Sequence, residues 1–428
     1  MRFRPFQSLS LPTKVPVIKL ALAAVWLLLL QFCYFYSARD PGSFFFDAER
    51  AYKPHLSNLR EAEAEKFIQQ AVNTPATATS PQAQQINHHV SEHTQNASRI
   101  CVGIPTKGRE KEQFLPRTLA SLVDTLSPLE RTYLHLIVLI TEDDPTQNPA
   151  YGQSWLTNIA DEVLLYTPAP KHLQEETYRH IGDHIPGRKA GRNEHVKFDY
   201  ATLMEACNER EMDHFLLVED DIITVPDWFQ RLILALDLVE ATNQPNDWLY
   251  LRLFYTELYH GWNSEEWPMY IRRLLIVYAA TAFGTWVAIR VWARVFQGRL
   301  PGLWHCVLSF HFFFIAFTAL FFMAGRVSVS HHQEGVREMN KFGCCAQGLA
   351  FPKRHLVWLT QKLRDPPHGI PGDSFIEVMA DEKGLQRWAM EPSVFQHVGV
   401  RGSSAKGGES RLEWNFGFET SSYIDQRG

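Results

Sequence analysis

Three adjacent carboxylates are the residues best suited to chemistry. Glu219, Asp220 and Asp221 directly follow the apolar run at 215–218. Carboxylates at the end of a buried strand repel one another and lose solvation, so a positive group should offset them. Their hard oxygen ligands suit Mn²⁺ or Mg²⁺. The sequence therefore predicts a metal site, at which the cation would neutralise a departing nucleotide diphosphate.

A second acidic run has the same composition. Glu142-Asp143-Asp144 also follows an apolar stretch, at 133–140. For either run the alternative interpretation is a solvated acidic turn, because clusters of charge usually face water. Periodicity does not distinguish the two runs, so the pattern by itself leaves open which of them binds a metal.

A basic turn follows the first apolar run of this region. Residues 105–109 read Pro-Thr-Lys-Gly-Arg, between the run at 100–104 and a helical pattern. The start of a helix presents free backbone N–H groups, and basic side chains beside them suit phosphate. We therefore expect this turn to bind a nucleotide and its phosphates.

Short apolar runs alternate with amphipathic segments from residue 100 onward. Strands are expected at 100–104, 133–140, 163–166, 215–218 and 248–253, and helices at 113–126, 153–161, 198–211 and 227–241. This alternation predicts an α/β fold with a mainly parallel sheet covered on both faces. Ligands bind beyond the carboxyl ends of the strands in such sheets. The carboxylates and the basic turn both lie at such ends.

Three longer apolar stretches indicate a membrane protein. Residues 15–36 are mostly apolar, and about 20 such residues cross a core of roughly 30 Å. The run ends in aromatic residues rather than a cleavage site, which favours an uncleaved anchor. Basic residues gather on its N-terminal side, so the N-terminus is expected in the cytosol and the bulk of the chain in the lumen.

The other two stretches, 274–296 and 303–324, are joined by a short turn rich in Gly and Pro. Two buried core helices are the alternative, because the first stretch contains Arg290 and Arg294. The length and aromatic content of the second stretch favour a membrane hairpin. A hairpin returns the chain to its starting side, so the segments that flank it can fold together.

These features predict six consecutive parts. They are a cytosolic tail at 1–14, an anchor at 15–36, a stem at 37–99, the first part of the catalytic domain at 100–269, an inserted hairpin at 270–325 and the second part at 326–428. The stem holds a Thr-, Pro- and Gln-rich stretch unlikely to bury a core, and ends at the sequon Asn96-Ala97-Ser98.

Composition excludes other classes of protein. The formal net charge of -5 gives no basic field for a polyanion, which argues against nucleic-acid binding. The six cysteines show no zinc-site spacing. Cys33 and Cys306 fall in apolar runs, which leaves four cysteines that could pair in an oxidising compartment.

Four motifs in a fixed order make the chain similar to a known family. They are VGIPT at 102–106 with Arg109, Lys197 with Asp199-Tyr200 and Leu203-Met204, LLVEDDII at 216–223, and EPSVFQHVG with Ser403-Ser404 at 391–404. They resemble those of the N-acetylglucosaminyltransferase IV group, which are GT-A enzymes that use a UDP-sugar. The resemblance spans residues 100–268 and 327–404.

The anchor, the stem, the inserted hairpin and the adjacent Cys344 and Cys345 resemble a narrower group, the post-GPI-attachment to proteins factor 4 family. That resemblance implies a GT-A domain in the Golgi lumen and transfer of N-acetylgalactosamine from UDP to a mannose of the glycosylphosphatidylinositol (GPI) core. It also implies a UDP-sugar donor, a GPI-anchored glycan acceptor and a manganese or magnesium cofactor.

The resemblance also assigns roles to individual residues. Glu219, Asp220 and Asp221 match a DXD-type metal motif, with Glu219 in place of the first aspartate, so which carboxylates contact the metal stays open. His397 is expected to complete the metal or diphosphate shell, although a lone histidine is more often a packed or surface residue. The donor wall and sugar pocket would comprise Ile104, Pro105, Thr106, Arg109, Cys344, Cys345, Ala346 and Gln347, although packing explains the apolar members equally well.

A β-linked product from an α-linked UDP-sugar requires inversion, and therefore a base for the acceptor hydroxyl. Asp373 matches an aspartate at this place in both related families, with a helix cap as its alternative role. Glu377 is the second candidate base. The runner-up functions are an N-glycan-branching N-acetylglucosaminyltransferase, which the hairpin argues against, and a non-catalytic scaffold on a GT-A fold. The transferred sugar is not fixed by the sequence.

Overall fold

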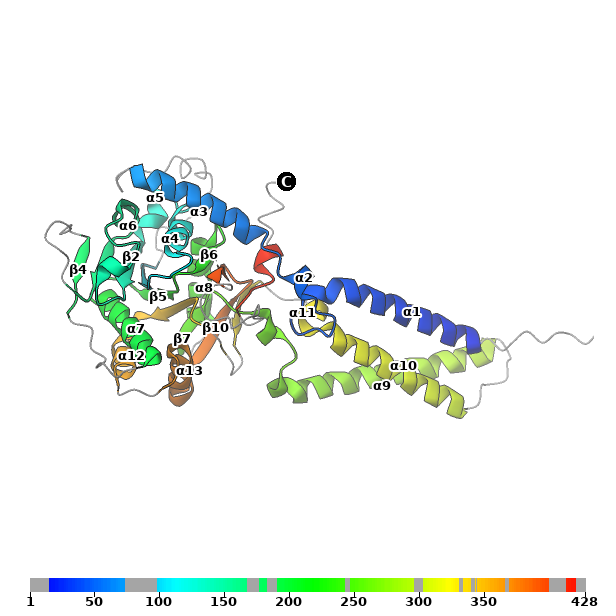
Figure 1. Ribbon diagram of the computed structural model, residues 1–428. Helices are drawn as coiled ribbons and strands as arrows, with labels where there is room; N and C mark the ends of the chain where they lie inside the picture. Colours follow the sequence, from blue (N-terminus) through cyan, green and yellow to red (C-terminus); the bar gives the residue numbers. More distant parts are fainter. Residues whose placement is uncertain are drawn as a thin grey trace, which may run out of the picture. The chain divides into compact units, whose positions relative to one another are not determined.

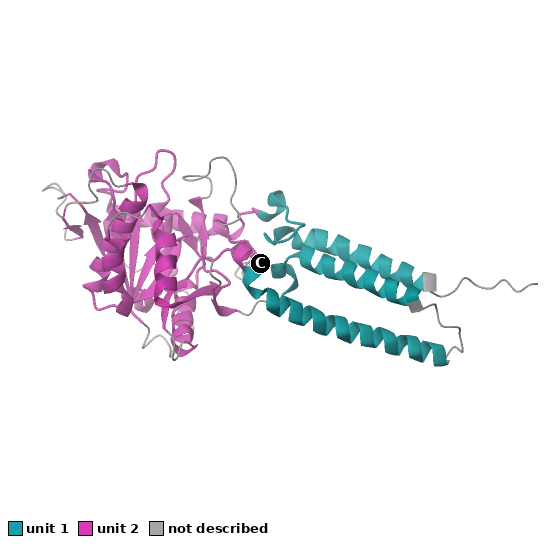
Figure 2. Ribbon diagram, turned by 90° about the horizontal axis from the view of Figure 1, so that it is seen from below, with its two compact units in different colours: residues 1–51, 260–331 teal, residues 52–259, 332–428 magenta. Residues whose placement is uncertain are grey.

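The structure is a computed structural model. It describes residues 15–73, 98–167, 177–182, 191–242, 247–295, 303–330, 334–339, 343, 345–365, 369–399 and 413–420. The predicted cytosolic tail, the sequon asparagine, Cys344 and the Ser403-Ser404 pair lie outside these ranges. The chain forms two compact units, Met1–Ala51 with His260–His331, and Tyr52–Tyr259 with His332–Gly428 (Figure 2).

The second unit contains a mixed, mainly parallel sheet. Its strand order is β4-β3-β2-β1-β5-β9-β7-β10-β8. The bounds are β1 Ile100–Thr106, β2 Leu134–Ile140, β3 Glu162–Leu165, β4 Tyr178–His180, β5 His214–Val218, β7 Trp248–Arg252, β8 Gly335–Glu338, β9 Gly348–Pro352 and β10 Gln386–Glu391. Strands β4, β3, β2, β1 and β5 are parallel in succession, whereas β9 runs antiparallel to β5 and β7. The predicted fold class is confirmed.

Helices cover both faces of this sheet (Figure 1). One core contains α4 Leu115–Val123, α6 Ser154–Ile159 and α8 Trp228–Thr242, and the other contains α7 Arg192–Asn208, α12 Leu356–Leu363 and α13 Gly372–Lys383. Successive side chains of β1 point to opposite faces of the sheet, so Val102 lies in the first core and Cys101 in the second. Gly103 lets α7 approach closely, because a Cβ there would lie 3.1 Å from Leu203 Cβ of α7 and 2.7 Å from the Phe215 ring of β5.

Helix α3, Leu56–Asn73, lies in the segment predicted as stem and packs on the sheet unit, against α4 and α6. Arg60 is 1% exposed and donates to Thr224 O, Glu63 and Asp124. The amide groups of Leu56 and Ser57 donate to the C-terminal Glu419. These contacts make α3 part of the core, although its sequence is highly charged.

The first unit is built from three long helices, α1 Val15–Tyr36, α9 Trp267–Val295 and α10 Leu303–Ala324. Spans at Val17–Arg39, Glu257–Arg294 and Trp304–Ala324 are long and apolar enough to cross a membrane. Trp26 Nε1 donates to Ala316 O over 3.0 Å, which joins α1 to α10. The expected turn between α9 and α10 lies outside the described residues. The predicted anchor and helix pair are confirmed.

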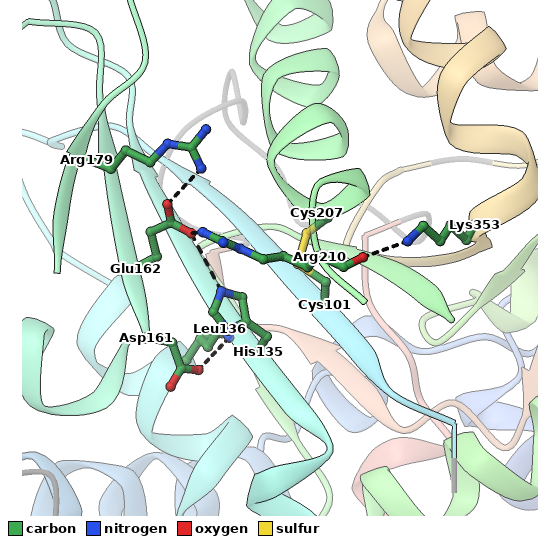
Figure 3. Close-up of a disulfide and its surroundings, with 9 residues drawn as sticks. All are labelled: Cys101, His135, Leu136, Asp161, Glu162, Arg179, Cys207, Arg210 and Lys353. Atoms are coloured by element: carbon green, nitrogen blue, oxygen red, sulfur yellow. Dashed lines mark hydrogen bonds and ion pairs between the residues drawn. A yellow bond between two sulfur atoms is a disulfide. The ribbon is translucent and has the colours of Figure 1, made fainter. Parts of the chain in front are cut away.

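The cysteines divide as their positions indicate. Cys33 and Cys306, both in apolar helices, are free. Cys101 on β1 and Cys207 on α7 form a disulfide that fastens the helix to the sheet (Figure 3). Cys345 is also disulfide-bonded.

Candidate active site

The carboxylate run lies at the carboxyl end of β5, the edge where ligands of such sheets bind. Beyond it the chain forms the short strand β6, Ile222–Thr224, which pairs antiparallel with β11, Phe395–His397. In this pairing His397 lies opposite Ile222. The ribbon therefore brings a residue from the far C-terminal part of the chain beside the acidic run.

Glu219, Asp221 and His397 form a candidate metal centre. Their potential ligand atoms all lie within 4.8 Å of one another. His397 Nε2 is 3.2 Å from Asp221 Oδ2, and within the described part of the chain the buried Asp221 Oδ1 has no hydrogen-bond partner. The other ring nitrogen, Nδ1, is 3.1 Å from the Glu413 carbonyl. A proton on Nδ1 would leave Nε2 free to bind a metal, as in many histidine metal ligands. The residues present therefore fit a divalent cation.

Burial and mutual charge shift the pKa values of these three groups. Burial raises the pKa of Glu219 to about 8, and the negative charge of Asp221 adds to the rise. Burial also acts to raise the pKa of Asp221, but the charge of His397 outweighs it and leaves this pKa lowered. Burial acts to lower the pKa of His397, and Asp221 reverses this and raises it. At neutral pH Glu219 and His397 therefore hold protons that a bound cation would displace.

The Asp220 side chain binds residues outside the candidate metal centre. Its two oxygens accept from Thr106 Oγ1 at 2.8 Å and from Arg109 Nη2 at 2.5 Å. Arg109 Nη2 also donates to Asp221 over 2.8 Å, and its buried Nη1 has no hydrogen-bond partner among the described ranges. Thr106 and Arg109 therefore lie beside the acidic run, as expected for a diphosphate wall. Asp220 orients these residues and is not a member of the candidate metal centre.

Ile104 and Pro105 belong to the carboxyl end of β1, where Ile104 is fully buried and Pro105 partly exposed. This places the predicted uridine wall at the same edge of the sheet as Asp220, whose side chain contacts Thr106. The motif at 104–109 therefore approaches the carboxylate run through tertiary structure.

The second acidic run has a structural role. Glu142 accepts from the Gly108 amide over 2.5 Å and from Asn148 Nδ2 over 3.1 Å, which shapes the basic turn. Asp144 accepts from Thr146 N and begins the short helix Pro145–Gln147. These contacts distinguish the two runs, which the sequence pattern left open.

Asp373 lies near the start of α13 and is partly exposed. Its Oδ2 accepts from the Cys345 amide over 3.0 Å, and its Oδ1 from the Ser374 amide over 2.7 Å. The N-terminus of α13 has no side-chain cap hydrogen bond at Pro371. The hydrogen bond to Cys345 thus connects Asp373, the predicted base, to the predicted sugar pocket. Within that pocket Ala346 and Gln347 are buried.

Glu377, the second candidate base, is fully engaged elsewhere. Its carboxylate accepts from Tyr250, Arg252 and Arg387. Arg252 also donates to the Cys345 carbonyl. Sequence reasoning missed Arg252, although its position at the end of β7, beside the other strand ends, was an available signal.

The opposite edge of the sheet also has a hollow, of about 600 Å³. It is lined by His135, Asp161, Glu162, Tyr178, Arg179, His180 and Arg210. Glu162 binds both arginines (Figure 3). Burial acts to raise its pKa, but the hydrogen bond from His135 and the two arginines lower it to about 2. Because this carboxylate neutralises the arginines, the hollow is poorly suited to a nucleotide diphosphate.

Comparisons with known proteins agree with the sequence motifs. Residues 100–396, more than half of the chain, match the family model of GPI-N-acetylgalactosamine transferase PGAP4. The alpha-1,3-mannosyl-glycoprotein 4-beta-N-acetylglucosaminyltransferase B of Mus musculus is 29% identical over 161 residues, which are 36% of this chain and 28% of the relative. The Danio rerio protein of the same name is 28% identical over 144 residues, 31% and 25% of the two chains. This chain spans about a quarter of the length of these relatives.

Among solved structures, the mannosyltransferase PcManGT from Pyrobaculum calidifontis, in complex with GDP-Man and Mn²⁺, aligns with a TM-score of 0.23 and 11% identity. The alignment covers 47% of this chain and 45% of that one. The family match covers β1 through β10 and includes the carboxylate run and Asp373, and it ends one residue before His397. On that match, the chain belongs to the GPI-N-acetylgalactosamine transferase PGAP4 family.

Proposed function

We propose that this protein is a metal-dependent, inverting glycosyltransferase of the Golgi membrane. It transfers N-acetylgalactosamine from UDP to a mannose of the GPI glycan. Membership of the PGAP4 family supports the donor and the acceptor. The observation that carries the proposal is the cluster of Glu219, Asp221 and His397, with Arg109 bound to Asp221 at the carboxyl end of the sheet.

The proposed centre divides the work between two groups of residues. A divalent cation held by Glu219, Asp221 and His397 would neutralise charge on the leaving diphosphate. Arg109 and Thr106 bind that diphosphate and orient it, since Arg109 already lies between two carboxylates and has a buried, unpartnered Nη1. Ile104 and Pro105 form the wall against the uridine.

Asp373 is the proposed base. Its oxygens accept from two backbone amides, and carboxylate oxygens have further lone pairs for the proton of an acceptor hydroxyl. As that proton moves to Asp373, the mannose oxygen forms a bond to the anomeric carbon of the donor sugar. The bond from this carbon to UDP breaks on the opposite face, so the α-linked donor gives a β-linked product and UDP leaves with the electron pair.

The acceptor is a membrane glycolipid, and the three candidate membrane spans support this assignment. The inserted helix pair anchors the chain that contains the catalytic unit in the bilayer. The proposed topology places the N-terminus in the cytosol and the sheet unit in the Golgi lumen. The metal is Mn²⁺ or Mg²⁺, because the centre offers two carboxylates and an imidazole.

The test is transfer by the full-length protein in detergent. Each assay contains Mn²⁺, a GPI-mannose glycolipid and one of four donors, which are UDP-N-acetylgalactosamine, UDP-N-acetylglucosamine, UDP-galactose and UDP-glucose. The product is identified by mass spectrometry. The proton coupling of the new anomeric centre reports its configuration. We expect transfer from UDP-N-acetylgalactosamine with a β linkage, lost in Asp221→Asn and kept in the matched control Asp144→Asn.

The other candidate functions predict different results. Preferential transfer from UDP-N-acetylglucosamine to an N-glycan acceptor would favour the N-acetylglucosaminyltransferase activity for which the related proteins from Mus musculus and Danio rerio are named. Binding of UDP without transfer from any donor, by protein shown to be folded, would favour a non-catalytic scaffold.

A further inference from the structure

The peptide unit around Cys345 is held on both sides by charged residues, the partly exposed Asp373 and the buried Arg252. Its amide donates to Asp373 Oδ2 over 3.0 Å, and its carbonyl accepts from Arg252 Nη1. Cys345 has a φ of 76°, in the left-handed region that residues other than glycine rarely adopt. Such a conformation persists where the surroundings fix it. Here the two hydrogen bonds act together with the disulfide of Cys345 to supply that constraint.

Arg252 is itself fixed by a buried network. It is 1% exposed and is the last residue of β7, where it lies opposite Leu349 of β9 and Ala389 of β10. Glu377 accepts from Arg252 Nη2 and from the Tyr250 hydroxyl. Burial acts to lower the pKa of Arg252, but the neighbouring groups leave it raised, so the guanidinium stays charged. A charged fork anchored in the sheet therefore holds the Cys345 carbonyl.

Gly343 shows how closely this pair supports the chain beside Cys345. A Cβ at Gly343 would clash with Glu377 Oε1 and with Arg252 Nη2. After Cys345, Ala346 and Gln347 are buried, and Gly348 begins β9 between β5 and β7. The segment 345–347 is thus fixed by the Arg252–Glu377 pair at one end and by the sheet at the other.

Gln347 gives this segment a hydrogen-bond acceptor for a ligand. Its side chain is 3% exposed, and its buried Oε1 has no hydrogen-bond partner among the residues that the structure describes. A buried, unpaired acceptor is costly unless a ligand supplies a donor. The hydroxyl groups of a hexosamine and the N–H of its acetamido group are such donors.

We infer that Arg252 and Glu377 are positioning residues for the donor sugar: they fix the Cys345 peptide so that segment 345–347 presents a preformed surface to the hexosamine of the UDP-sugar. This inference rests on the proposed function. Neither residue belongs to the candidate metal centre or the diphosphate wall. Their loss therefore affects recognition of the sugar and leaves recognition of UDP intact.

The test compares binding of UDP-N-acetylgalactosamine and of UDP by calorimetry, with Mn²⁺ and full-length protein in detergent. For Arg252→Gln we expect the Kd of the UDP-sugar to rise at least tenfold and that of UDP to change less than twofold. In the transfer assay, the KM for the donor rises while the KM for the acceptor is unchanged. Arg252→Lys, which keeps a charged donor, recovers part of the loss.

Arg387→Gln is the matched control. Arg387 binds the other oxygen of Glu377 over 2.8 Å and also binds Asp381. Of these two arginines, only Arg252 donates to the Cys345 carbonyl. We expect Arg387→Gln to lower the melting temperature and to keep the Kd of the UDP-sugar. An equal rise in that Kd for Arg387→Gln, or an equal rise in the Kd of UDP for Arg252→Gln, overturns the inference.

Two further measurements keep the outcome decisive. If Arg252→Gln shows no cooperative thermal transition, the near-isosteric Glu377→Gln is measured in the same way, and an unchanged Kd of the UDP-sugar overturns the inference. The binding assay needs no turnover. Absence of transfer by the unmodified protein would therefore contradict the proposed function, whereas equal binding by unmodified protein and Arg252→Gln would contradict only the positioning role.

Discussion

Cys345 donates its backbone N–H to Asp373 Oδ2 over 3.0 Å, so the residue expected to act as base also supports the segment expected to bind the donor sugar. The second oxygen of Asp373 accepts from the Ser374 amide. The two hydrogen bonds orient the carboxylate. This arrangement suits a base whose position must be fixed before the acceptor arrives.

Asp373→Asn tests the base. An amide cannot take the proton of the acceptor hydroxyl, and general base catalysis contributes about 10²- to 10⁴-fold. We expect kcat for transfer to fall by about that factor. Asparagine keeps a side-chain oxygen that can accept from the Cys345 amide, so the KM for the UDP-sugar should change little. Steady-state kinetics with varied donor and acceptor measure both quantities.

The control for this variant is Ser374→Ala, which removes only the weak 3.4 Å contact from the Ser374 hydroxyl to Asp373. It should keep the kcat of the unmodified protein. A kcat for Asp373→Asn within twofold of the unmodified protein would remove Asp373 as the base. Glu377 could not replace it, because its carboxylate is held by Tyr250 and two arginines.

The metal centre predicts a ranked loss of Mn²⁺ affinity. Asp221→Asn removes charge at the centre of the cluster and should weaken binding at least tenfold. His397→Ala removes one ligand and should have an effect of similar size. Asp220→Asn should cost less, because Asp220 binds Thr106 and Arg109. Electron paramagnetic resonance of free Mn²⁺ measures the affinity without turnover.

The second acidic run supplies the control for that series. Asp144→Asn alters an exposed residue that begins a short helix, and should leave Mn²⁺ affinity unchanged. If Asp220→Asn weakened Mn²⁺ binding as much as Asp221→Asn, Asp220 would belong to the metal shell and the assignment of Glu219, Asp221 and His397 would need revision.

The sheet could be predicted because its central strands are uninterrupted apolar runs. Strands β1, β2 and β5 fall within or close to the ranges expected from 100–104, 133–140 and 215–218. The antiparallel strand β9 has no such signal, because the strand is only five residues long and follows a cysteine-rich segment. The ribbon of β6 and β11 has three residues in each strand, which is too short for periodicity to identify.

The site was predictable where neighbours in sequence are neighbours in space. Glu219, Asp220 and Asp221 are adjacent in the sequence, but the division of work between Asp220 and Asp221 depends on Arg109, more than 100 residues away. The approach of His397 came from the family resemblance and not from a pattern in the residues. Arg252 was missed because an arginine is usually exposed, although its position at the end of β7 was a signal that it lies near the site.

Asp199 predicts a pH-dependent stability. Burial raises the pKa of its carboxyl group to about 7, although the Tyr166 hydroxyl donates to it over 2.6 Å. The ordinary value, 3.8, applies to the unfolded chain. Between about pH 4 and pH 7 the folded protein therefore binds a proton that the unfolded chain has lost, so the free energy of unfolding falls as the pH rises. The shift corresponds to on the order of 2–4 kcal/mol.

Asp199→Asn removes this titration and keeps an oxygen for the Tyr166 hydroxyl. Relative to the unmodified protein, we expect the variant to gain stability as the pH rises from 4.5 to 7.5, in thermal unfolding followed by tryptophan fluorescence. His214, whose pKa burial lowers to about 4, titrates over part of the same range. The difference between the two proteins therefore carries the test, and a difference that is independent of pH would contradict it.

Arg60 predicts that α3 is required by the folded sheet unit. The Arg60 guanidinium is buried and binds Asp124 over 2.7 Å and the Thr224 carbonyl at the end of β6. Arg60→Met leaves Asp124 buried without its cation, and breaking such a pair costs about 3–5 kcal/mol. Arg117→Met, which removes partly exposed pairs with Glu61 and Glu112, should cost about 0–1 kcal/mol.

A double variant separates loss of charge pairing from loss of packing. Arg60→Met with Asp124→Leu removes the stranded carboxylate, so it should recover most of the stability lost in Arg60→Met alone. Because β6 pairs with the strand that contains His397, Arg60→Met should also weaken Mn²⁺ binding, whereas Arg117→Met should not. Equal melting temperatures for the two single variants would mean that α3 does not support the fold, and the segment 56–73 would then act only as a stem.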